Sequence, residues 1–141
     1  MPDDTRPDET ATQTHRGRCL CGAVRFAVAG PLRAPDACHC SQCRRQSGHY
    51  WASTNVAKDS LTLEGAEALA WYRSSETVRR GFCSVCGSVL FWEPDDHPAW
   101  TAVAMGAFDA PTGTRLEKHI HVADKGDYYD LADGVPQEAG P

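Results

Sequence analysis

The chain of 141 residues lacks any long hydrophobic run, and it has fewer basic than acidic residues. No apolar stretch approaches the roughly 18 residues that span a bilayer, so we expect no membrane partner. Lysine and arginine number 14 against 19 aspartates and glutamates, which gives a formal net charge of −5. Because binding to phosphates needs a basic surface, this balance argues against nucleic acid as a partner.

Apolar residues are also scarce at the start of the chain. Residues 1–16 carry four acidic side chains and two prolines, and they contain no apolar core of a secretory signal. We therefore predict a disordered tail over residues 1–16, one domain over residues 17–137 and a short tail over residues 138–141. Without an export signal we expect a cytoplasmic protein, in which disulfides rarely persist.

The interior of the chain lacks a helical hydrophobic period that continues for three turns, and short alternating segments separated by turn residues take its place. This pattern predicts an all-β fold of short strands. One hairpin is expected around residues 74–76, and one short helix after Cys40, through Gln46. The expected strands are residues 23–28, 50–56, 61–63, 69–72, 77–82, 89–92, 100–105 and 119–122.

Seven cysteines, an odd number, fall into three groups. Grouped cysteines in a chain without disulfides indicate metal ligands or reactive thiols. The groups are Cys19-Leu20-Cys21-Gly22, Cys38-His39-Cys40-Ser41-Gln42-Cys43 and Cys83-Ser84-Val85-Cys86-Gly87.

The first and third groups supply two cysteines each. A structural zinc takes four ligands in a tetrahedron, so Cys19, Cys21, Cys83 and Cys86 predict one site that ties the first strand to the middle of the chain. The glycine after each pair permits a turn with positive φ, which aims backbone N–H groups at the sulfurs. The alternative is two unrelated buried pairs.

The middle group leaves only three sulfurs, on Cys38, Cys40 and Cys43. Three protein ligands and an open fourth position are the pattern of a catalytic zinc. Three thiolates weaken such an ion as a Lewis acid, so thiol chemistry suits it better than water activation. Three alternatives stay open: a closed structural site completed by His39 or another histidine, a redox trio, and a site that no longer binds metal. Because His39 lies between two ligands, we expect its side chain to project away from the metal.

The sequence around the cysteines resembles that of a known family. The likeness is carried by residues 17–26 (GRCLCGAVRF), 38–44 (CHCSQCR) and 80–90 (RGFCSVCGSVL), and the ending over residues 119–137 is similar as well. These segments resemble the glutathione-dependent formaldehyde-activating enzyme family, also called the centromere protein V domain family. The resemblance covers roughly residues 16–137, and the order and spacing of the three cysteine motifs are highly specific for the family.

The resemblance implies an Mss4-like fold, a β-tent of short antiparallel strands with zinc sites. It assigns a structural zinc to the four cysteines of the outer groups and a catalytic zinc to Cys38, Cys40 and Cys43. We therefore expect two Zn²⁺ ions per chain, the second more labile than the first. The family's founding activity forms S-(hydroxymethyl)glutathione, so the expected function is a zinc-dependent carbon–sulfur lyase acting on the adduct of an aldehyde with glutathione or another thiol.

Other residues are candidates for contacts in that reaction. His39 and His49 could protonate the new alkoxide. Arg44 and Arg45 directly follow the middle group and could bind a carboxylate of glutathione, although a solvated turn is an equally good interpretation. Residues 127–130 could cover the site as a flap, or form an ordinary edge segment.

The competing interpretation is a non-catalytic zinc-binding module for protein interaction, in which both metals are structural. The ligand count at the middle group discriminates the two. A fourth protein ligand would close that site, whereas an open position would support catalysis.

Overall fold

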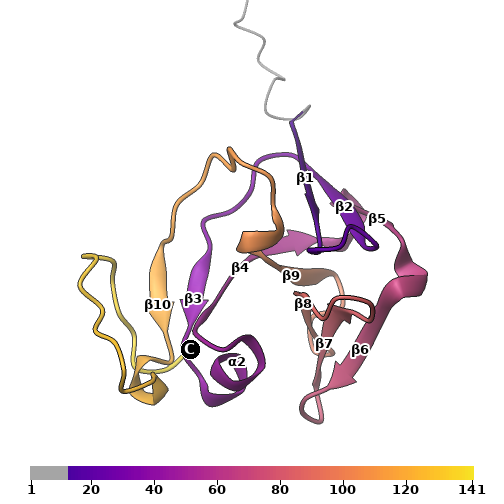
Figure 1. Cartoon of the computed structure of the whole chain (residues 1–141). Coiled ribbons are helices and arrows are strands. Elements are labelled where there is room, and N and C mark those ends of the chain that lie inside the picture. The colour runs from indigo at the N-terminus through magenta and orange to yellow at the C-terminus, as the bar shows by residue number, and fades with distance from the viewer. Residues whose placement is uncertain (1–12) are drawn as a thin grey trace, which may run out of the picture.

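In the computed structural model, residues 13–141 can be described, and they form two sheets joined by short connections (Figure 1). The predicted disorder of residues 1–12 lies outside the described residues. The first strand, β1 (Thr14–Arg18), begins three residues before the predicted domain boundary. Thr14, His15 and Arg16 therefore belong to a strand, because they pair with the antiparallel strand β2.

The smaller sheet has the order β1-β2-β5, with β2 spanning Arg25–Ala29 and β5 spanning Leu61–Glu64. Both pairings are antiparallel. In β2 the side chains alternate, as a half-buried strand requires: Phe26 and Val28 are buried, while Arg25 and Ala29 are exposed. This alternation turns one face of the small sheet toward the larger sheet.

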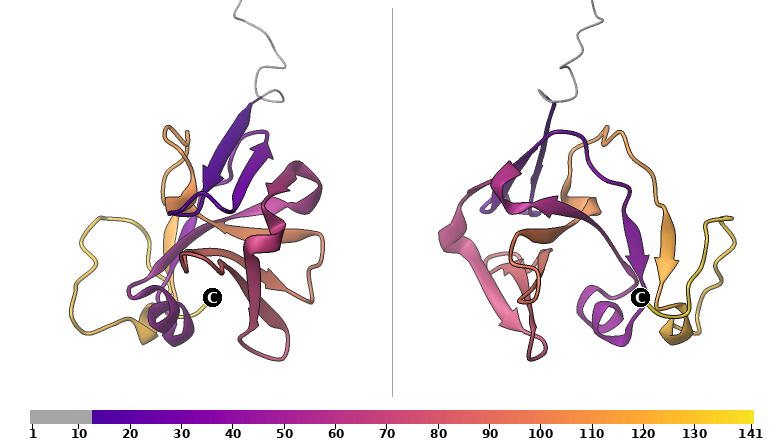
Figure 2. Two further views of the ribbon diagram at one scale, coloured as in Figure 1. Left: turned by 45° about the vertical axis from the view of Figure 1, so that its right-hand side comes forward. Right: turned by 180° about the vertical axis from the view of Figure 1, so that it is seen from behind.

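The larger sheet has seven strands in the order β10-β3-β4-β9-β8-β7-β6. It bends strongly, so that β3 and β10 lie on one side and β6 to β8 on the other (Figures 1 and 2). Every pairing in it is antiparallel except that of β10 with β3, which is parallel. The strands are β3 (Asp36–Cys38), β4 (Trp51–Ala57), β6 (Leu69–Arg73), β7 (Val78–Cys83), β8 (Val89–Pro94), β9 (Trp100–Ala104) and β10 (Lys118–Ile120).

One α-helix, α2 (Ser41–Ser47), follows β3 directly. Cys40 is its N-cap, and the Cys40 sulfur accepts a hydrogen bond from the Cys43 N–H. Gly48 ends the helix with φ 87°, in the left-handed region where glycine carries no steric cost. Between residues 13 and 141 there are also four short 3₁₀ helices: η1 (Lys58–Ser60), η2 (Ala66–Ala68), η3 (Met105–Ala107) and η4 (Val122–Asp124).

The main core lies between the two sheets. Phe26 of the small sheet packs edge-on against Phe91 and Phe108, with ring centroids 5.7 and 5.2 Å apart. Cys19 and Cys83 belong to this same buried cluster, so the outer cysteine groups are anchored in the core. A second cluster around Cys43 and three sheet residues joins α2 to the larger sheet.

The structure confirms the all-β class, the hairpin at residues 74–76 and the helix after Cys40. The sequence did not predict two of the strands, β1 and β3. The residues predicted as a C-terminal tail are tied down, since the N–H groups of His121, Val122 and Ala123 donate to carbonyls of residues 138–140. Within residues 13–141, no helix is long and apolar enough to cross a membrane.

Candidate metal centres and cavity

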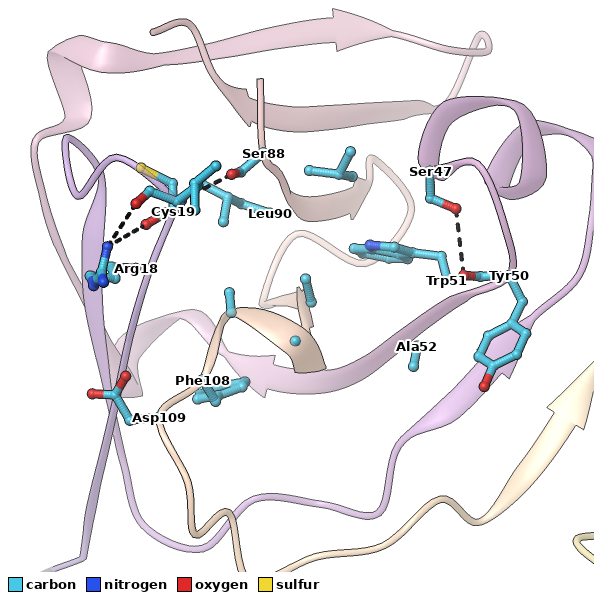
Figure 3. A pocket seen from close by; sticks show the side chains of 15 residues that line it. Arg18, Cys19, Ser47, Tyr50, Trp51, Ala52, Ser88, Leu90, Phe108 and Asp109 are labelled. Atoms are coloured by element: carbon cyan, nitrogen blue, oxygen red, sulfur yellow. Dashed lines mark hydrogen bonds between the residues drawn. The ribbon is translucent and has the colours of Figure 1, made fainter. Parts of the chain in front are cut away.

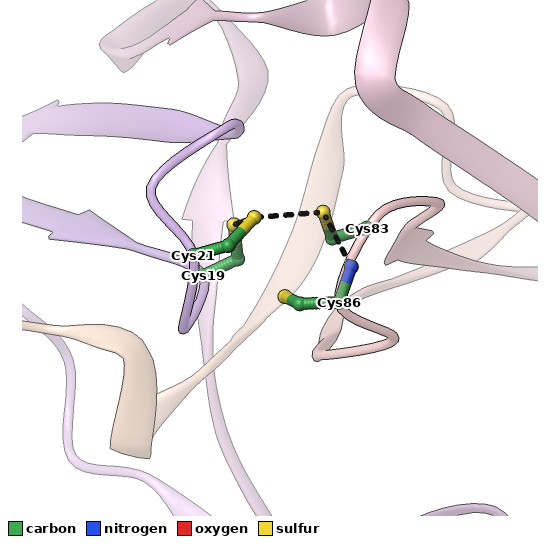
Figure 4. A group of neighbouring side chains, drawn as sticks. All are labelled: Cys19, Cys21, Cys83 and Cys86. Carbon is green, nitrogen blue, oxygen red and sulfur yellow. Dashed lines mark hydrogen bonds between the residues drawn. The ribbon is translucent and has the colours of Figure 1, made fainter.

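The four outer cysteines come together in space, as their spacing predicts (Figure 4). Their sulfur atoms all lie within 4.8 Å of one another. The Sγ atoms of Cys19 and Cys21 are 3.7 Å apart, and those of Cys21 and Cys83 are 3.8 Å apart. A tetrahedral zinc with Zn–S bonds of about 2.3 Å requires sulfur separations of about 3.8 Å. The donor set and its dimensions therefore fit a structural zinc.

The two turns that carry these cysteines have the same construction. Gly22 and Gly87 both adopt φ 83°, so each turn uses the glycine that the motif provides. The N–H of Val24 donates to the Cys19 sulfur over 3.3 Å. The N–H groups of Val85 and Cys86 donate to the Cys83 sulfur over 3.4 and 3.5 Å. Backbone donors of this kind stabilise thiolates that bind metal.

Ser88 joins the two turns. The Leu20 N–H donates to the Ser88 hydroxyl oxygen over 3.0 Å, and that hydroxyl lies 3.1 Å from the Cys86 sulfur. The hydroxyl hydrogen bond lowers the pKa of Cys86 to about 5. This cysteine is thus prepared to act as a thiolate near neutral pH.

The three sulfurs of the middle group form a second cluster. Cys38 ends β3, Cys40 caps α2, and Cys43 lies in the first turn of α2. The three Sγ atoms lie within 4.8 Å of one another, and in residues 13–141 no histidine or carboxylate joins the group at that distance. The donor set fits a soft metal ion such as zinc, with three protein ligands.

Charge in this cluster is concentrated on one sulfur. Hydrogen bonds from the Cys38 and Cys43 thiols, with the N–H of Cys43, lower the pKa of Cys40. The same thiol contacts raise the pKa of Cys38, because it keeps its proton beside the Cys40 thiolate. Cys40 is therefore the first of the three to carry negative charge.

Arg80 of β7 is a site residue that the sequence interpretation missed. Its side chain is only 4% exposed, and its Nη1 donates to the Cys43 sulfur over 3.6 Å. The other donors reach Ser74, Gln46 and Gln42 over 3.0 to 3.2 Å. The signal that could have revealed it is the position of an arginine between the apolar residues Val78 and Phe82 of a predicted strand, since a buried guanidinium needs an anionic partner.

The three sulfurs open onto a cavity of about 340 Å³. Arg80 and the half-buried indoles of Trp92 and Trp100 form part of its wall, and Trp51 forms another part. His121, which adopts φ 55° at the end of β10, also lines it. The remaining lining residues are Asp36, Gln42, Ser53, Asn55, Val78, Ala102, Ile120 and Pro141.

His39 points away from this cavity into a buried chain of polar groups. Its Nδ1 contacts the Tyr129 hydroxyl, and its Nε2 lies 2.9 Å from Nδ1 of His119. His119 in turn places Nε2 at 2.8 Å from the Asp133 carboxylate. With each group donating to the next, from Tyr129 to Asp133, every ring nitrogen of the two histidines has a partner. Burial, with the neighbouring His119 ring, lowers the pKa of His39 to about 4.

The other predicted contact residues lie outside the cavity. Arg44 and Arg45 are on α2, half-buried and exposed respectively, and neither lines the cavity. His49 pairs with the Tyr128 hydroxyl over 2.6 Å. The segment 127–130 thus packs, through Tyr128 and Tyr129, against the residues next to α2 rather than over the three sulfurs.

A larger cavity of about 630 Å³ lies between the first cysteine turn and the junction of α2 with β4 (Figure 3). Arg18 and Asp109 stand at one end of it, and Ser47 and Tyr50 at the other. Of the seven cysteines, only Cys19 lines this cavity. The smaller cavity is therefore the better candidate for chemistry.

Comparisons with known proteins agree with this arrangement. The family model described as glutathione-dependent formaldehyde-activating enzyme matches residues 14–124. A Halomonas elongata protein, provisionally named as such an enzyme, is 35% identical over 100 residues. That match covers 62% of this chain and 64% of the Halomonas protein.

Two further matches extend over more of the chain. A Schizosaccharomyces pombe protein named as an uncharacterised lyase is 25% identical over 122 residues, 84% of this chain and 85% of that protein. A crystal structure of a Rhodobacter sphaeroides protein superposes with a TM-score of 0.57, covering 87% of this chain and 98% of that one. At 22% identity, this last similarity supports the fold alone.

Proposed function

The chain belongs to the glutathione-dependent formaldehyde-activating enzyme family, and on that basis we propose that it is a zinc-dependent carbon–sulfur lyase that makes and breaks the adduct of a thiol, such as glutathione, with an aldehyde. In the forward direction the thiol sulfur bonds to the aldehyde carbon, the C=O π pair moves to oxygen, and that oxygen takes up a proton as the thiol loses one. The observation that carries the proposal is the group of three sulfurs, without a fourth ligand among the described side chains, at a cavity.

A zinc ion at Cys38, Cys40 and Cys43 would lower the pKa of an incoming thiol and polarise a carbonyl oxygen. Because the three cysteines line the cavity, both effects would act on a ligand bound there. Zinc with three thiolates leaves one net negative charge, and the Arg80 guanidinium beside Cys43 offsets it. Arg80 also fixes the side chain of Cys43, since Gln42, Gln46 and Ser74 hold the guanidinium on its other sides.

We assign proton delivery to His121 rather than to His39. His121 lines the cavity together with the sulfurs, so its ring can reach the oxygen of a bound adduct. Both ring nitrogens of His39 are occupied, by Tyr129 and His119, on the opposite side of the loop. His39 then serves to hold the Cys38–Cys40 loop in place.

The proposal also gives roles to the four outer cysteines and to the two arginines that the sequence predicted as glutathione contacts. Cys19, Cys21, Cys83 and Cys86 would hold a structural zinc that ties the two sheets together. Arg44 and Arg45 can meet a glutathione carboxylate only where the peptide extends beyond the cavity. We place the protein in a reducing compartment such as the cytoplasm, where cysteines stay free to bind metal.

The test is exchange spectroscopy by NMR on ¹³C-formaldehyde with glutathione. The zinc-loaded protein should speed the exchange between free formaldehyde and the S-hydroxymethyl adduct. The Cys40→Ser variant, folded but lacking the full middle group, should restore the uncatalysed rate. Equal rates with and without the wild-type protein, with both metals bound, would instead favour the non-catalytic zinc module.

A further inference from the structure

Three of the chain's four tryptophans line the small cavity: Trp51, Trp92 and Trp100. Trp51 is opposite Cys38 in the β3–β4 pairing, and Trp92 is opposite Arg80 in the β7–β8 pairing. The indoles therefore share the sheet face that carries the sulfurs and the guanidinium. The rings of Trp92 and Trp100 are stacked, with centroids 6.1 Å apart and planes inclined by 25°.

The core leaves part of the Trp92 and Trp100 side chains uncovered. Trp92 and Trp100 are half-buried, and together with Val78 and Ile120 they present apolar surface to the cavity. Apolar surface that faces a cavity gains free energy when a ligand covers it. Formaldehyde has only two heavy atoms and would leave these rings uncovered.

The charged groups that line the cavity also favour an uncharged ligand. The guanidinium of Arg80 already donates to Ser74, Gln46, Gln42 and Cys43, so four of its five N–H groups are engaged by the protein. The side-chain carboxyl group in the lining belongs to Asp36, which would repel a second carboxylate. The cavity is thus poorly suited to a charged carboxylate and well suited to a flat, uncharged group.

We infer that the aldehyde taken by this site has an aromatic body, which packs against Trp92 and Trp100 while its carbonyl carbon lies beside the three sulfurs. The inference rests on the proposed function for the reaction, but the aromatic preference itself depends only on the cavity. The reaction stays a plain addition: the sulfur–carbon bond forms, the carbonyl π bond breaks, and no oxidant or reductant is needed.

The test is calorimetric titration of the zinc-loaded full chain with benzyl mercaptan, 2-mercaptoethanol and glutathione. Benzyl mercaptan reproduces the sulfur–carbon–aryl spacing of an adduct with an aromatic aldehyde, and 2-mercaptoethanol has a thiol without the ring. Benzyl mercaptan should bind at least about tenfold more tightly than 2-mercaptoethanol, because aromatic stacking on indole adds to apolar burial. Trp92→Ala should bring the two affinities within about twofold, whereas Trp92→Phe should keep most of the preference.

Trp71→Phe is the matched control. Trp71 packs against Phe91 and Arg79 outside the cavity, so its replacement should leave the preference unchanged. If Trp92→Ala does not fold by circular dichroism, Trp100→Ala takes its place, with the same expected loss. A wild-type preference below about threefold, or one that survives the alanine substitution, would overturn the inference.

The three thiols separate this inference from the proposed function. A benzyl preference without glutathione binding would keep the aromatic site and overturn glutathione as the thiol. Glutathione binding without a benzyl preference would overturn the aromatic site alone. If none of the thiols binds, both proposals fail.

Discussion

Arg80 and Cys43 are 37 positions apart in the chain, and they meet through a buried hydrogen bond of 3.6 Å from Nη1 to Sγ. The contact joins β7 of the larger sheet to the helix α2, which contains Cys43 and is capped by Cys40. It brings a fixed positive charge to a cluster of thiols, and the proposed metal chemistry depends on that charge.

The first prediction concerns this contact. Arg80→Met should weaken metal binding at the middle group by about tenfold to a hundredfold, because a hydrogen bond between a charged group and a thiolate is lost in a buried site. Arg80→Lys should retain part of the affinity. Competition with a chromophoric chelator on the cobalt-loaded protein measures the effect.

Arg79→Met is the control for that experiment. Arg79 is the next residue on β7, and it pairs with Glu93 and lies over the Trp71 ring, away from the sulfurs. Its loss should leave the affinity of both metal sites unchanged. Equal weakening by Arg79→Met and Arg80→Met would contradict a specific role for Arg80.

The second prediction separates the two metal centres. Cys83 is fully buried in the main core and accepts two backbone hydrogen bonds, so Cys83→Ser should unfold the domain or cost several kcal/mol of stability. Cys40→Ser should keep the fold, one tightly bound metal per chain and little activity. Thermal unfolding by circular dichroism and metal analysis give the two readouts, and equal destabilisation by both changes would refute the division.

Gradual metal removal gives a third prediction. Three ligands hold an ion less firmly than four, so a chelator titration should reduce the zinc content from about two to about one per chain while the far-UV spectrum stays native. Loss of the second ion should then coincide with unfolding. A single step in which both ions leave with the fold would show that the middle site is structural.

The fourth prediction concerns pH. The N–H of His119 donates to Asp133 and lowers the pKa of that carboxyl below its usual value. A carboxylate with a depressed folded pKa contributes stability above its unfolded pKa of about 3.9, and that stability is lost as the pH falls through the folded pKa. Asp133→Asn should therefore lower the unfolding free energy at pH 7, and its difference from the wild type should shrink below pH 4.

Urea unfolding at pH 7, 4 and 3 measures this difference. Asp127→Asn, which removes an exposed carboxylate from the same C-terminal segment, is the control and should have little effect. A difference between wild type and Asp133→Asn that stays constant over the three pH values would show that the carboxylate does not act through His119.

Much of this architecture was predictable because its signals are local. The cysteine spacings predicted both sulfur clusters, with glycines after the outer pairs, and alternation located most strands. The strand β3 has only three residues, too few for a pattern to emerge, and it is held by neighbours on both sides. Its parallel pairing with β10 joins segments about 80 residues apart, which no local signal reports.

The contacts of the site that escaped prediction share that long-range character. Arg80 meets Cys43 across 37 positions, and His39 meets His119 across 80. Arg80 and His39 each have an ordinary sequence neighbourhood, and only the fold shows that each is buried with a partner. His39 projects away from the sulfurs, as its position between two cysteines predicts, and His121, distant in sequence, is the histidine that lines the cavity.

The central claim is that the three middle sulfurs form an open metal site that takes a thiol. Calorimetric titration of glutathione into the zinc-loaded wild type and into Cys40→Ser tests it most directly, with S-methylglutathione as the ligand that lacks a free thiol. The account predicts one glutathione bound per wild-type chain, none by Cys40→Ser, and much weaker binding of the thioether. Equal binding of glutathione by both proteins, or equal binding of the thiol and the thioether, would contradict it.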